Sequence, residues 1–456
     1  MLAAVLTLLI IMGIGVYSGM RIKDVKEFDS GGKSAGAILV AGSIIGTLVG
    51  GSSTIGTAEL AFKSGLSAWW FTLGASLGCL LLALPLCRPL RDTKGETIQE
   101  MIGLEFGDTS RVATSILASL GIMLNIVAQM LAANALLTTM FGLDSWMCAV
   151  ISIVIMTCYV MFGGMRGTGI LGVVKLVLIY CAALVCGFTA LHLTGGLGEI
   201  AARLPAEQYF NLFARGPFID LGAGVSVALG VVSTQTYIQA IRSAKSDKAA
   251  RQGALIGAVM IPPIGILSIL VGYFMKLEFP DMSAGQAFPR FLIERLPPVL
   301  GGVFLATLLI AIVGTGSGMA LGFGKIVTND IYKRYIRPNA DGREQLIVTR
   351  AVILLSLVVA AVFTTGNLGS AILTWGFMSM GLRAVVLLVP MLMALYLPGR
   401  MRSGFAIAAS VLGLAAMLIG NFLSLPFDSL FLGLAVSVAV IVIGLCVGCK
   451  PKNESV

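Results

Sequence analysis

Long apolar stretches follow one another along this chain, separated by short polar segments. Thirteen of them are long enough to cross a bilayer as helices. No polar segment between them is long enough to form a separate soluble domain. The pattern therefore predicts an all-α integral membrane protein with spans near 1–19, 36–63, 67–88, 112–141, 145–163, 167–193, 219–242, 250–276, 298–332, 345–364, 368–396, 403–421 and 428–448.

The second span is interrupted in its middle by residues that disfavour a helix. The stretch Gly46 to Gly56 contains four glycines and the hydroxyl run Ser52, Ser53 and Thr54. Glycine inside a helix costs about 1 kcal/mol relative to alanine, and hydroxyl side chains compete for backbone groups. We expect the helix to break here, which lipid tolerates only where the freed backbone lines a protein cavity. A close crossing of two helices through small residues is the alternative explanation.

Basic residues are concentrated in alternate loops. They cluster at 21–33, 88–111, 242–251 and 333–350, and the positive-inside rule then predicts an outside N-terminus and a cytoplasmic C-terminus in a cell membrane. The five spans from 36 and the five from 219 thus begin on opposite sides, and each group opens with a glycine-rich helix. This indicates an inverted repeat with a binding site between its halves. We divide the chain into a helix and loop (1–35), a first repeat (36–193), a second repeat (219–396) and two final helices with a short tail (397–456).

The composition agrees with a membrane protein. Hydrophobic residues make up 57% of the chain and charged residues 12%, about half the charged share of a soluble protein. The net charge of +9 comes from residues in the short loops, so it does not indicate nucleic-acid binding. A single histidine and the lack of paired aspartates in the spans argue against an enzyme, and no motif requires a cofactor.

Four short motifs occur in order along the chain: Gly31-Gly32-Lys33-Ser34, Asn125 to Asn134 with Phe141-Gly142, Gln235 to Ser246, and Thr328 to Lys333. They resemble, in the same order, those of the sodium:solute symporter family. The resemblance implies the leucine-transporter fold, with ten core helices in two inverted halves, one helix before them and two after. It also implies a secondary active transporter that couples a cation, sodium, to symport of a small organic solute by alternating access.

The resemblance also implies a sodium site between the first and eighth core helices. Its ligands would be the carbonyls of Gly46, Val49 and Ala311 and the hydroxyl of Thr315. Gly314 stands where the family usually has serine. Glycine has no side-chain oxygen, and hard cations require several oxygen ligands, so the site is expected to be weakened.

Lys175 is a second departure from the family, because it aligns with a glutamine of the fifth core helix. A lysine at this depth normally faces the bundle interior. In one interpretation its ammonium occupies or borders the sodium site, with Gly314 leaving room. The protein would then be a proton-coupled or sodium-independent transporter in which Lys175 replaces the ion. In the other interpretation the side chain extends to the inner surface.

Arg383 lies near the middle of the tenth core helix, where an uncompensated charge costs at least ~2.5 kcal/mol. It either contributes to binding an anionic substrate or bonds to freed carbonyls. A small organic anion or an amino acid is therefore favoured as the solute. A sugar is disfavoured because the family's sugar binders use polar and aromatic side chains on the sixth and second core helices, whereas Val227 to Gly230 stand at the matching sixth-helix positions and 67–88 carries no carboxylate or amide. A sensor or receptor on the transporter fold is a more distant alternative. The remaining candidates for substrate binding are Gly50, Ser52, Ser53, Thr54, Asn125, Gln129, Ser233 and Gln235.

Overall fold

A computed structural model describes Thr7 and residues 35–447, except 96, 368, 370 and 424, and gives only the helical backbone of 160–173. The described residues are helical and form no sheet, although Ala35 and Ala244 make an isolated parallel bridge. Nine helices in this part of the chain are long and apolar enough to cross a membrane, and a bent helix pair adds a tenth. The expected all-α multi-pass membrane protein is confirmed.

The first half of the described chain contains helices of very different length. They are α3 (Ala37–Leu48), η1 (Ser52–Gly56), α4 (Thr57–Ser64), η2 (Gly65–Trp69), α5 (Trp70–Ala83), α6 (Cys87–Asp92), α7 (Ile98–Phe106), α8 (Asp108–Phe141) and α9 (Ser145–Leu193).

The second half begins with two short helices and continues with the longer spans. They are α10 (Leu197–Arg203), α11 (Ala206–Tyr209), α12 (Pro217–Val232), α13 (Gln235–Arg242), α14 (Asp247–Glu278), η3 (Ala284–Gln286), α15 (Ala287–Glu294), α16 (Pro298–Ile326), η4 (Val327–Ile336), α17 (Gly342–Thr365), α18 (Ile372–Tyr396), α19 (Ser403–Phe422) and α20 (Ser429–Val447).

The predicted spans and the observed helices differ in one place. The structure has the single helix α9 where the sequence predicted separate spans at 145–163 and 167–193. The predicted first span at 1–19, the loop to residue 34 and the tail beyond 447 lie outside the described residues. The number thirteen and the five-plus-five repeat therefore stay predictions.

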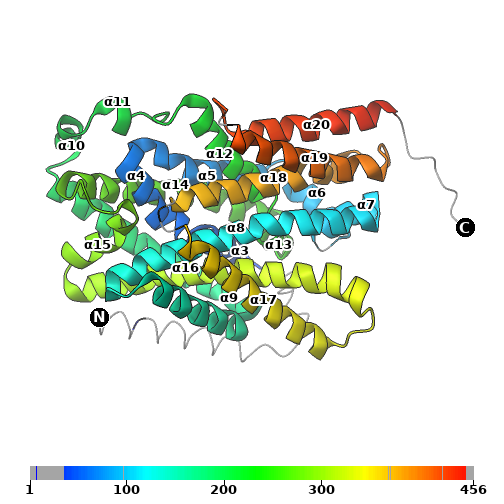
Figure 1. Ribbon diagram of the computed structural model, residues 1–456, viewed down its shortest axis with the longest axis horizontal. Coiled ribbons are helices and arrows are strands. Elements are labelled where there is room, and N and C mark those ends of the chain that lie inside the picture. The colour runs from blue at the N-terminus through cyan, green and yellow to red at the C-terminus, as the bar shows by residue number, and fades with distance from the viewer. Residues whose placement is uncertain are drawn as a thin grey trace, which may run out of the picture.

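The long helices lie side by side along the longest axis of the molecule (Figure 1). Helices α8, α16 and α18 are the most buried of the membrane candidates, and α17 and α20 are among the least. One end carries α7 and the turn between α16 and α17, and the opposite end carries α10, α11 and α15 (Figure 1). We call the first end the basic face, because arginines such as Arg91 and Arg111 make ion pairs there. The charge pattern predicts that this face is cytoplasmic.

Both glycine-rich spans are broken, as the sequence predicted for the span at 36–63. Helix α3 ends at Leu48, Val49 is extended (φ −87°, ψ 95°), and the chain continues as the π-helix η1. Helices α12 and α13 form one span that bends by 48° at Ser233 and Thr234. The residues at the breaks themselves, 49–51 and 233–234, are buried, so the irregular backbone lies inside protein, as a membrane interior requires.

Close contact between α5 and α12 depends on glycine. A Cβ atom added at Gly74 would lie 2.3 Å from the carbonyl oxygen of Gly224. Because that oxygen belongs to backbone, it can move away only if a whole helix shifts. The two helices can therefore approach this closely only without a side chain at Gly74.

We expect Gly74→Ala to destabilise the protein by about 1–3 kcal/mol, because overpacking forces the helices apart. The measurement is thermal unfolding of the purified protein in detergent. Gly404→Ala is the matched control, since no heavy atom lies within 4 Å of a Cβ at that helical position. Equal melting temperatures for the two variants would contradict the packing described.

Candidate functional site

The ammonium group of Lys175 lies between the broken helix and α16. Its Nζ donates hydrogen bonds to the carbonyl of Gly46 (2.5 Å), the carbonyl of Ala311 (2.8 Å) and the hydroxyl of Thr315 (3.1 Å). An ammonium has three N–H donors and no acceptor, so these bonds use its full capacity. The Lys175 residue is only 5% exposed and points into the bundle.

The break after α3 makes the Gly46 carbonyl available to this lysine. In an unbroken helix that carbonyl would accept a hydrogen bond from the amide of Gly50, four residues later. The Gly50 amide instead donates to Ser53 Oγ at 3.0 Å. The glycine-rich stretch thus frees a backbone oxygen, and the ammonium bonds to it.

Gln129 on α8 holds the broken backbone in place. Its Oε1 accepts a hydrogen bond from the amide of Gly51 at 3.0 Å, and its Nε2 donates to Ser52 Oγ at 3.3 Å. A Cβ on Gly50 would lie 2.6 Å from Thr315 Oγ1, and one on Gly51 would lie 2.4 Å from a side-chain carbon of α8. Glycine is therefore required at both positions for this approach.

Gly314 provides space beside the ammonium. A Cβ there would lie 3.3 Å from the Tyr159 hydroxyl and 3.6 Å from Lys175 Nζ. Of the other expected cation ligands, Gly46, Ala311 and Thr315 meet at the ammonium, whereas Val49 makes no bond to it. These three oxygens cannot all serve a sodium ion while the ammonium lies among them.

Most of the polar residues expected to bind solute are bonded within the protein. Ser53 and Thr54 donate to the Gly50 carbonyl (3.0 and 2.9 Å), so they satisfy the break itself. Gln235 accepts a hydrogen bond from the amide of Ile98 at 2.9 Å. Ser233 Oγ and Asn125 Oδ1, in contrast, are buried without a hydrogen-bond partner.

Arg383 is 1% exposed and makes hydrogen bonds to neutral groups. It donates to Thr234 Oγ1 (2.7 Å), to the Ser379 carbonyl and hydroxyl (both 3.1 Å) and to Met380 Sδ (3.1 Å). Within the described part of the chain it belongs to no ion pair. The guanidinium is thus held in place but keeps an uncompensated charge.

A narrow cleft of about 20 Å³ adjoins Arg383 on the basic-face side of Lys175. Its volume is close to that of one water molecule, so the conformation seen here is closed to an organic solute. We call it the Arg383 cleft. It is lined by Gln99, Ala118, Ile122, Ser233, Thr234, Gln235, Thr236, Gly318, Met319, Gly322, Ile326, Arg383 and Leu387.

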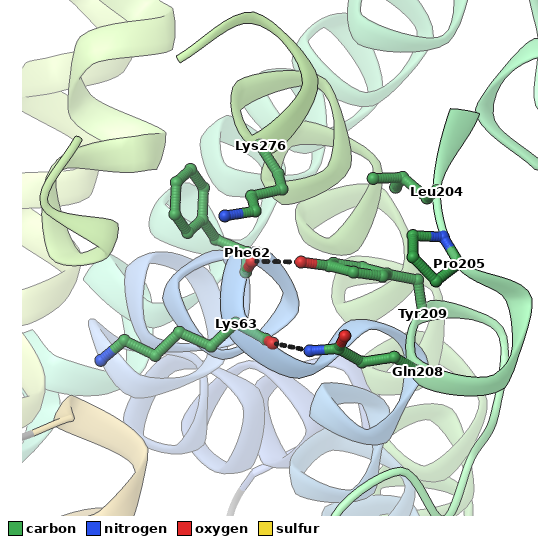
Figure 2. Close-up of a pocket in the computed structure, with 7 residues that line it drawn as sticks. All are labelled: Phe62, Lys63, Leu204, Pro205, Gln208, Tyr209 and Lys276. Carbon is green, nitrogen blue, oxygen red and sulfur yellow. Dashed lines mark hydrogen bonds between the residues drawn. The ribbon is translucent and has the colours of Figure 1, made fainter. Parts of the chain in front are cut away.

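A larger hollow of about 500 Å³ opens near the opposite face, but its walls offer little to a solute. Tyr209 donates to the Phe62 carbonyl at 3.3 Å, and Gln208 donates to the Lys63 carbonyl at 3.0 Å. The Lys63 ammonium points away from the hollow, and Lys276 lies beside the Phe62 ring (Figure 2). The hollow includes no residue of either break, so we do not treat it as the transport site.

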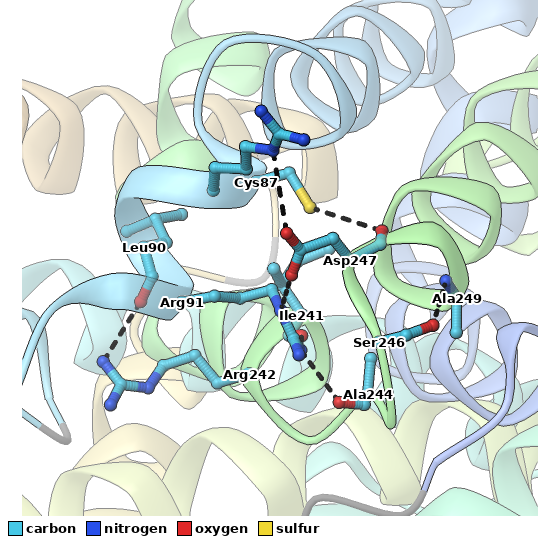
Figure 3. Close-up of polar contacts among 10 residues, drawn as sticks. Cys87, Leu90, Arg91, Ile241, Arg242, Ala244, Ser246, Asp247 and Ala249 are labelled. Atoms are coloured by element: carbon cyan, nitrogen blue, oxygen red, sulfur yellow. Dashed lines mark hydrogen bonds and ion pairs between the residues drawn. The ribbon is translucent and has the colours of Figure 1, made fainter.

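The basic face is closed by a set of bonds around Arg91, which we call the Arg91 network (Figure 3). Arg91 donates to Asp247 Oδ1 at 2.7 Å and to the carbonyls of Ile241 and Ala244, both at 2.9 Å. The Cys87 thiol donates to the Asp247 carbonyl at 3.9 Å. The network ties α6 to the turn between α13 and α14, directly after the second broken span.

Sequence reasoning did not single out several residues of these sites. Tyr159 limits the space at Gly314, and Gln99 and Thr236 line the Arg383 cleft. Tyr159 and Gln99 belong to no motif, and Thr236 lies within the Gln235 to Ser246 motif without standing out there. Each becomes relevant only through contacts between distant helices. The position of Thr236 just after the glycine-rich part of the span at 219–242 is the one signal in the sequence that could have drawn attention to it.

A membrane bundle with two broken helices around a buried polar centre is the architecture of a secondary transporter. The chain belongs to the sodium:solute symporter family, whose sequence profile matches residues 28–413. This membership confirms the resemblance of the four motifs and agrees with a protein that is not an enzyme.

Relatives and solved structures agree with this assignment. The chain is 23% identical to the osmoregulated proline transporter OpuE of Bacillus subtilis, over 89% of this chain and 85% of that protein. It is 25% identical to a sodium/proline symporter of Staphylococcus aureus, over 77% and 72%. A substrate-bound, outward-open Na⁺-coupled sialic acid symporter superposes with a TM-score of 0.80 at 17% identity, covering 98% of both chains. The last likeness supports the fold alone.

We expect Arg91→Gln to open the basic face, since it removes three bonds of the Arg91 network. Cys87 is 4% exposed and reports on the opening. Loss of the Arg91 charge by itself disfavours the Cys87 thiolate and slows alkylation. Several-fold faster alkylation of Cys87 in the Arg91→Gln variant can therefore come only from opening of the basic face. The rate is measured by mass spectrometry at that residue.

Arg88→Gln is the matched control for this experiment. Arg88 is exposed, and its Nε lies 3.7 Å from Asp247, so its loss removes a nearby charge but few contacts. The control variant should alkylate no faster than the unaltered protein. Unchanged or slower alkylation in Arg91→Gln would show that the network does not close this face.

Proposed function

We propose that this protein is a secondary active transporter of a small organic solute in which the Lys175 ammonium takes the place of a coupling cation. The observation that carries the proposal is the set of three hydrogen bonds from Lys175 to Gly46, Ala311 and Thr315. Transport would then be independent of sodium at this site. Proton-driven uptake and exchange without a coupling ion are the two forms that such a transporter can take.

The composition of the site supports a resident ammonium. A sodium ion needs several oxygen ligands, and Gly314 withholds the hydroxyl that the family usually provides. An ammonium needs three acceptors, and three are present. The space that glycine leaves at residue 314 is bordered by the ammonium and by the Tyr159 hydroxyl.

The closed contacts at the basic face support alternating access. The Arg383 cleft lies between the centre and this face and is too small for a solute, while the Arg91 network ties the adjoining helices together. Passage through the protein therefore requires these contacts to open. The proposal retains the inverted repeat of 36–193 and 219–396 and the outside N-terminus.

We also propose that the solute is a small organic anion or an amino acid. The Bacillus subtilis and Staphylococcus aureus relatives described above are proline transporters, and the structural neighbour is a sialic acid symporter. Both compounds carry a carboxylate. L-Proline and sialic acid are therefore the first probes to use.

Sodium-coupled symport is the second candidate. Family membership and the sodium-coupled relatives favour it. It requires the Lys175 side chain to leave the three oxygens during the transport cycle, so that sodium can reach them.

The test is uptake of labelled solute into proteoliposomes, with the sodium and proton gradients varied independently. We expect uptake that an inward sodium gradient does not increase. Replacing Lys175 with Gln removes the resident charge, and adding Gly314→Ser supplies the missing hydroxyl. The double variant should gain sodium-stimulated uptake, whereas Lys175→Gln alone should show little.

Lys276→Gln is the matched control, because it removes a lysine near the opposite face. It should behave as the unaltered protein. The proposal of a resident ammonium would be rejected if sodium stimulated uptake by the unaltered protein and if this stimulation were lost or unchanged in the double variant. That result would favour sodium-coupled symport.

A further inference from the structure

The buried charges of the described bundle are unbalanced. Three buried carboxylates each have a basic partner of their own: Glu59 pairs with Lys63 at 3.2 Å, Asp220 with Arg215 at 2.6 Å and Asp330 with Arg111 at 2.8 Å. The two buried cations, Lys175 and Arg383, bond only to neutral groups among the residues described.

Charge balance therefore favours an anion in the bundle. An uncompensated charge near the bilayer centre is costly. Lys175 uses its three donors on protein oxygens. Arg383 has five N–H donors, and one of its four bonds goes to the weak sulfur acceptor of Met380. Arg383 is thus the cation that can accept an anionic partner.

The second helix break directs a positive dipole end toward the same place. The cleft is lined by Ser233 and Thr234, where α12 ends, and by Gln235 and Thr236, where α13 begins. The first amides of a helix and its dipole favour a negative group.

The opposing carbonyl end of α12 is already satisfied. Its Leu229 and Gly230 carbonyls accept hydrogen bonds from the Ser233 amide and the Thr234 hydroxyl. The partial negative charge at the carboxyl end of α12 is therefore partly compensated. The partial positive charge at the amino end of α13 then has the stronger electrostatic effect on the cleft.

Three side-chain atoms in the lining have no hydrogen-bond partner. They are Ser233 Oγ, Thr236 Oγ1 and Gln99 Oε1, and the Ser233 and Gln99 residues are 1% and 2% exposed. A buried polar atom without a partner costs about 1–3 kcal/mol. The two hydroxyls can donate to an anion, whereas Gln99 Oε1 requires a donor. Such a set fits a ligand that carries a carboxylate and a nearby N–H or O–H group.

We propose that the Arg383 cleft binds the carboxylate of the transported solute, with Arg383, Ser233 and Thr236 as donors. The inference rests on the proposed transport function and adds the substrate class: amino acids and hydroxy acids. Gln99 Oε1 accepts a hydrogen bond from the amino or hydroxyl group of the solute.

The position of the cleft makes it a site on the route to the basic face. Gly318 and Gly322 lie three and seven residues beyond Thr315 on α16, which corresponds to ~5 and ~10 Å along the helix. No heavy atom lies within 4 Å of a Cβ at either glycine. The small residues leave open space along this side of α16, and the cleft widens for a solute only when α13 or α16 moves.

The test compares carboxylates with their uncharged amides in the purified full-length protein. The probes are L-proline with L-prolinamide and L-lactate with L-lactamide. The affinity of each probe is measured from the probe concentration at which the melting temperature of the protein rises. We expect at least one carboxylate to bind and its amide to bind about 10- to 100-fold more weakly, because a charge-assisted bond is lost.

Variants then assign this preference to the cleft. Ser233→Ala and Thr236→Val each remove a hydroxyl that bonds to nothing, so they should fold normally. Each should weaken carboxylate binding by about two- to tenfold. Arg383→Gln should abolish the preference over the amide. Arg290→Gln is the matched control, because Arg290 pairs with Glu294 far from the cleft, and it should leave the preference intact.

Several outcomes would overturn the inference. Equal binding of acid and amide, binding by neither acid, or unchanged carboxylate affinity in both hydroxyl variants would each do so. If Arg383→Gln does not fold, the hydroxyl variants decide. Uptake confined to neutral solutes would reject the carboxylate site and leave the transporter proposal standing, whereas loss of the proposed function would appear as no uptake of any solute.

Discussion

The contact between the Lys175 ammonium and the Gly46 carbonyl is the interaction on which the centre of this protein depends. An ammonium in a membrane interior is costly unless each N–H group is bonded, and a carbonyl freed from a helix has the same requirement. The broken helix supplies the acceptor, and the lysine supplies the donor. Each group satisfies the other, so the break and the charge form one structural unit that joins α3 to α9.

The surrounding helices are arranged to keep this unit intact. Gln129 bonds the backbone of Gly51 from α8, and Ala311 and Thr315 provide the remaining acceptors from α16. Such contacts require backbones to approach closely, and side chains on Gly50 or Gly51 would prevent it. The polar residues at the break thus serve first to satisfy the protein's own backbone. This explains why Ser53 and Thr54, which suggest a solute site in the sequence, are not free to bind one.

The electrostatics of the bundle link the centre to the solute. Buried carboxylates have their own basic partners, while Lys175 and Arg383 have only neutral ones among the described residues. An interior with excess positive charge attracts anions and repels cations, and both properties suit a transporter in which a resident ammonium substitutes for an ion. The Arg383 cleft is too small for a solute in this conformation, and the Arg91 network holds the end of α13, whose first residues line that cleft. In the proposed mechanism both sets of contacts open when the solute reaches the basic face.

The amino-acid sequence was enough to predict the all-helical membrane architecture, a helix break within Gly46 to Gly56 and the presence of Lys175 and Arg383 at membrane depth. Hydropathy, helix propensity and charge are local properties, so they are readable along the chain. The direction in which each polar side chain points becomes known from the packing of the helices. This packing directs Lys175 to three oxygens from α3 and α16, assigns Gln129 to the broken backbone and places Gln99 beside Ser233 and Arg383. These are contacts between residues far apart in the sequence, and their partners are set by how helices pack rather than by any local pattern.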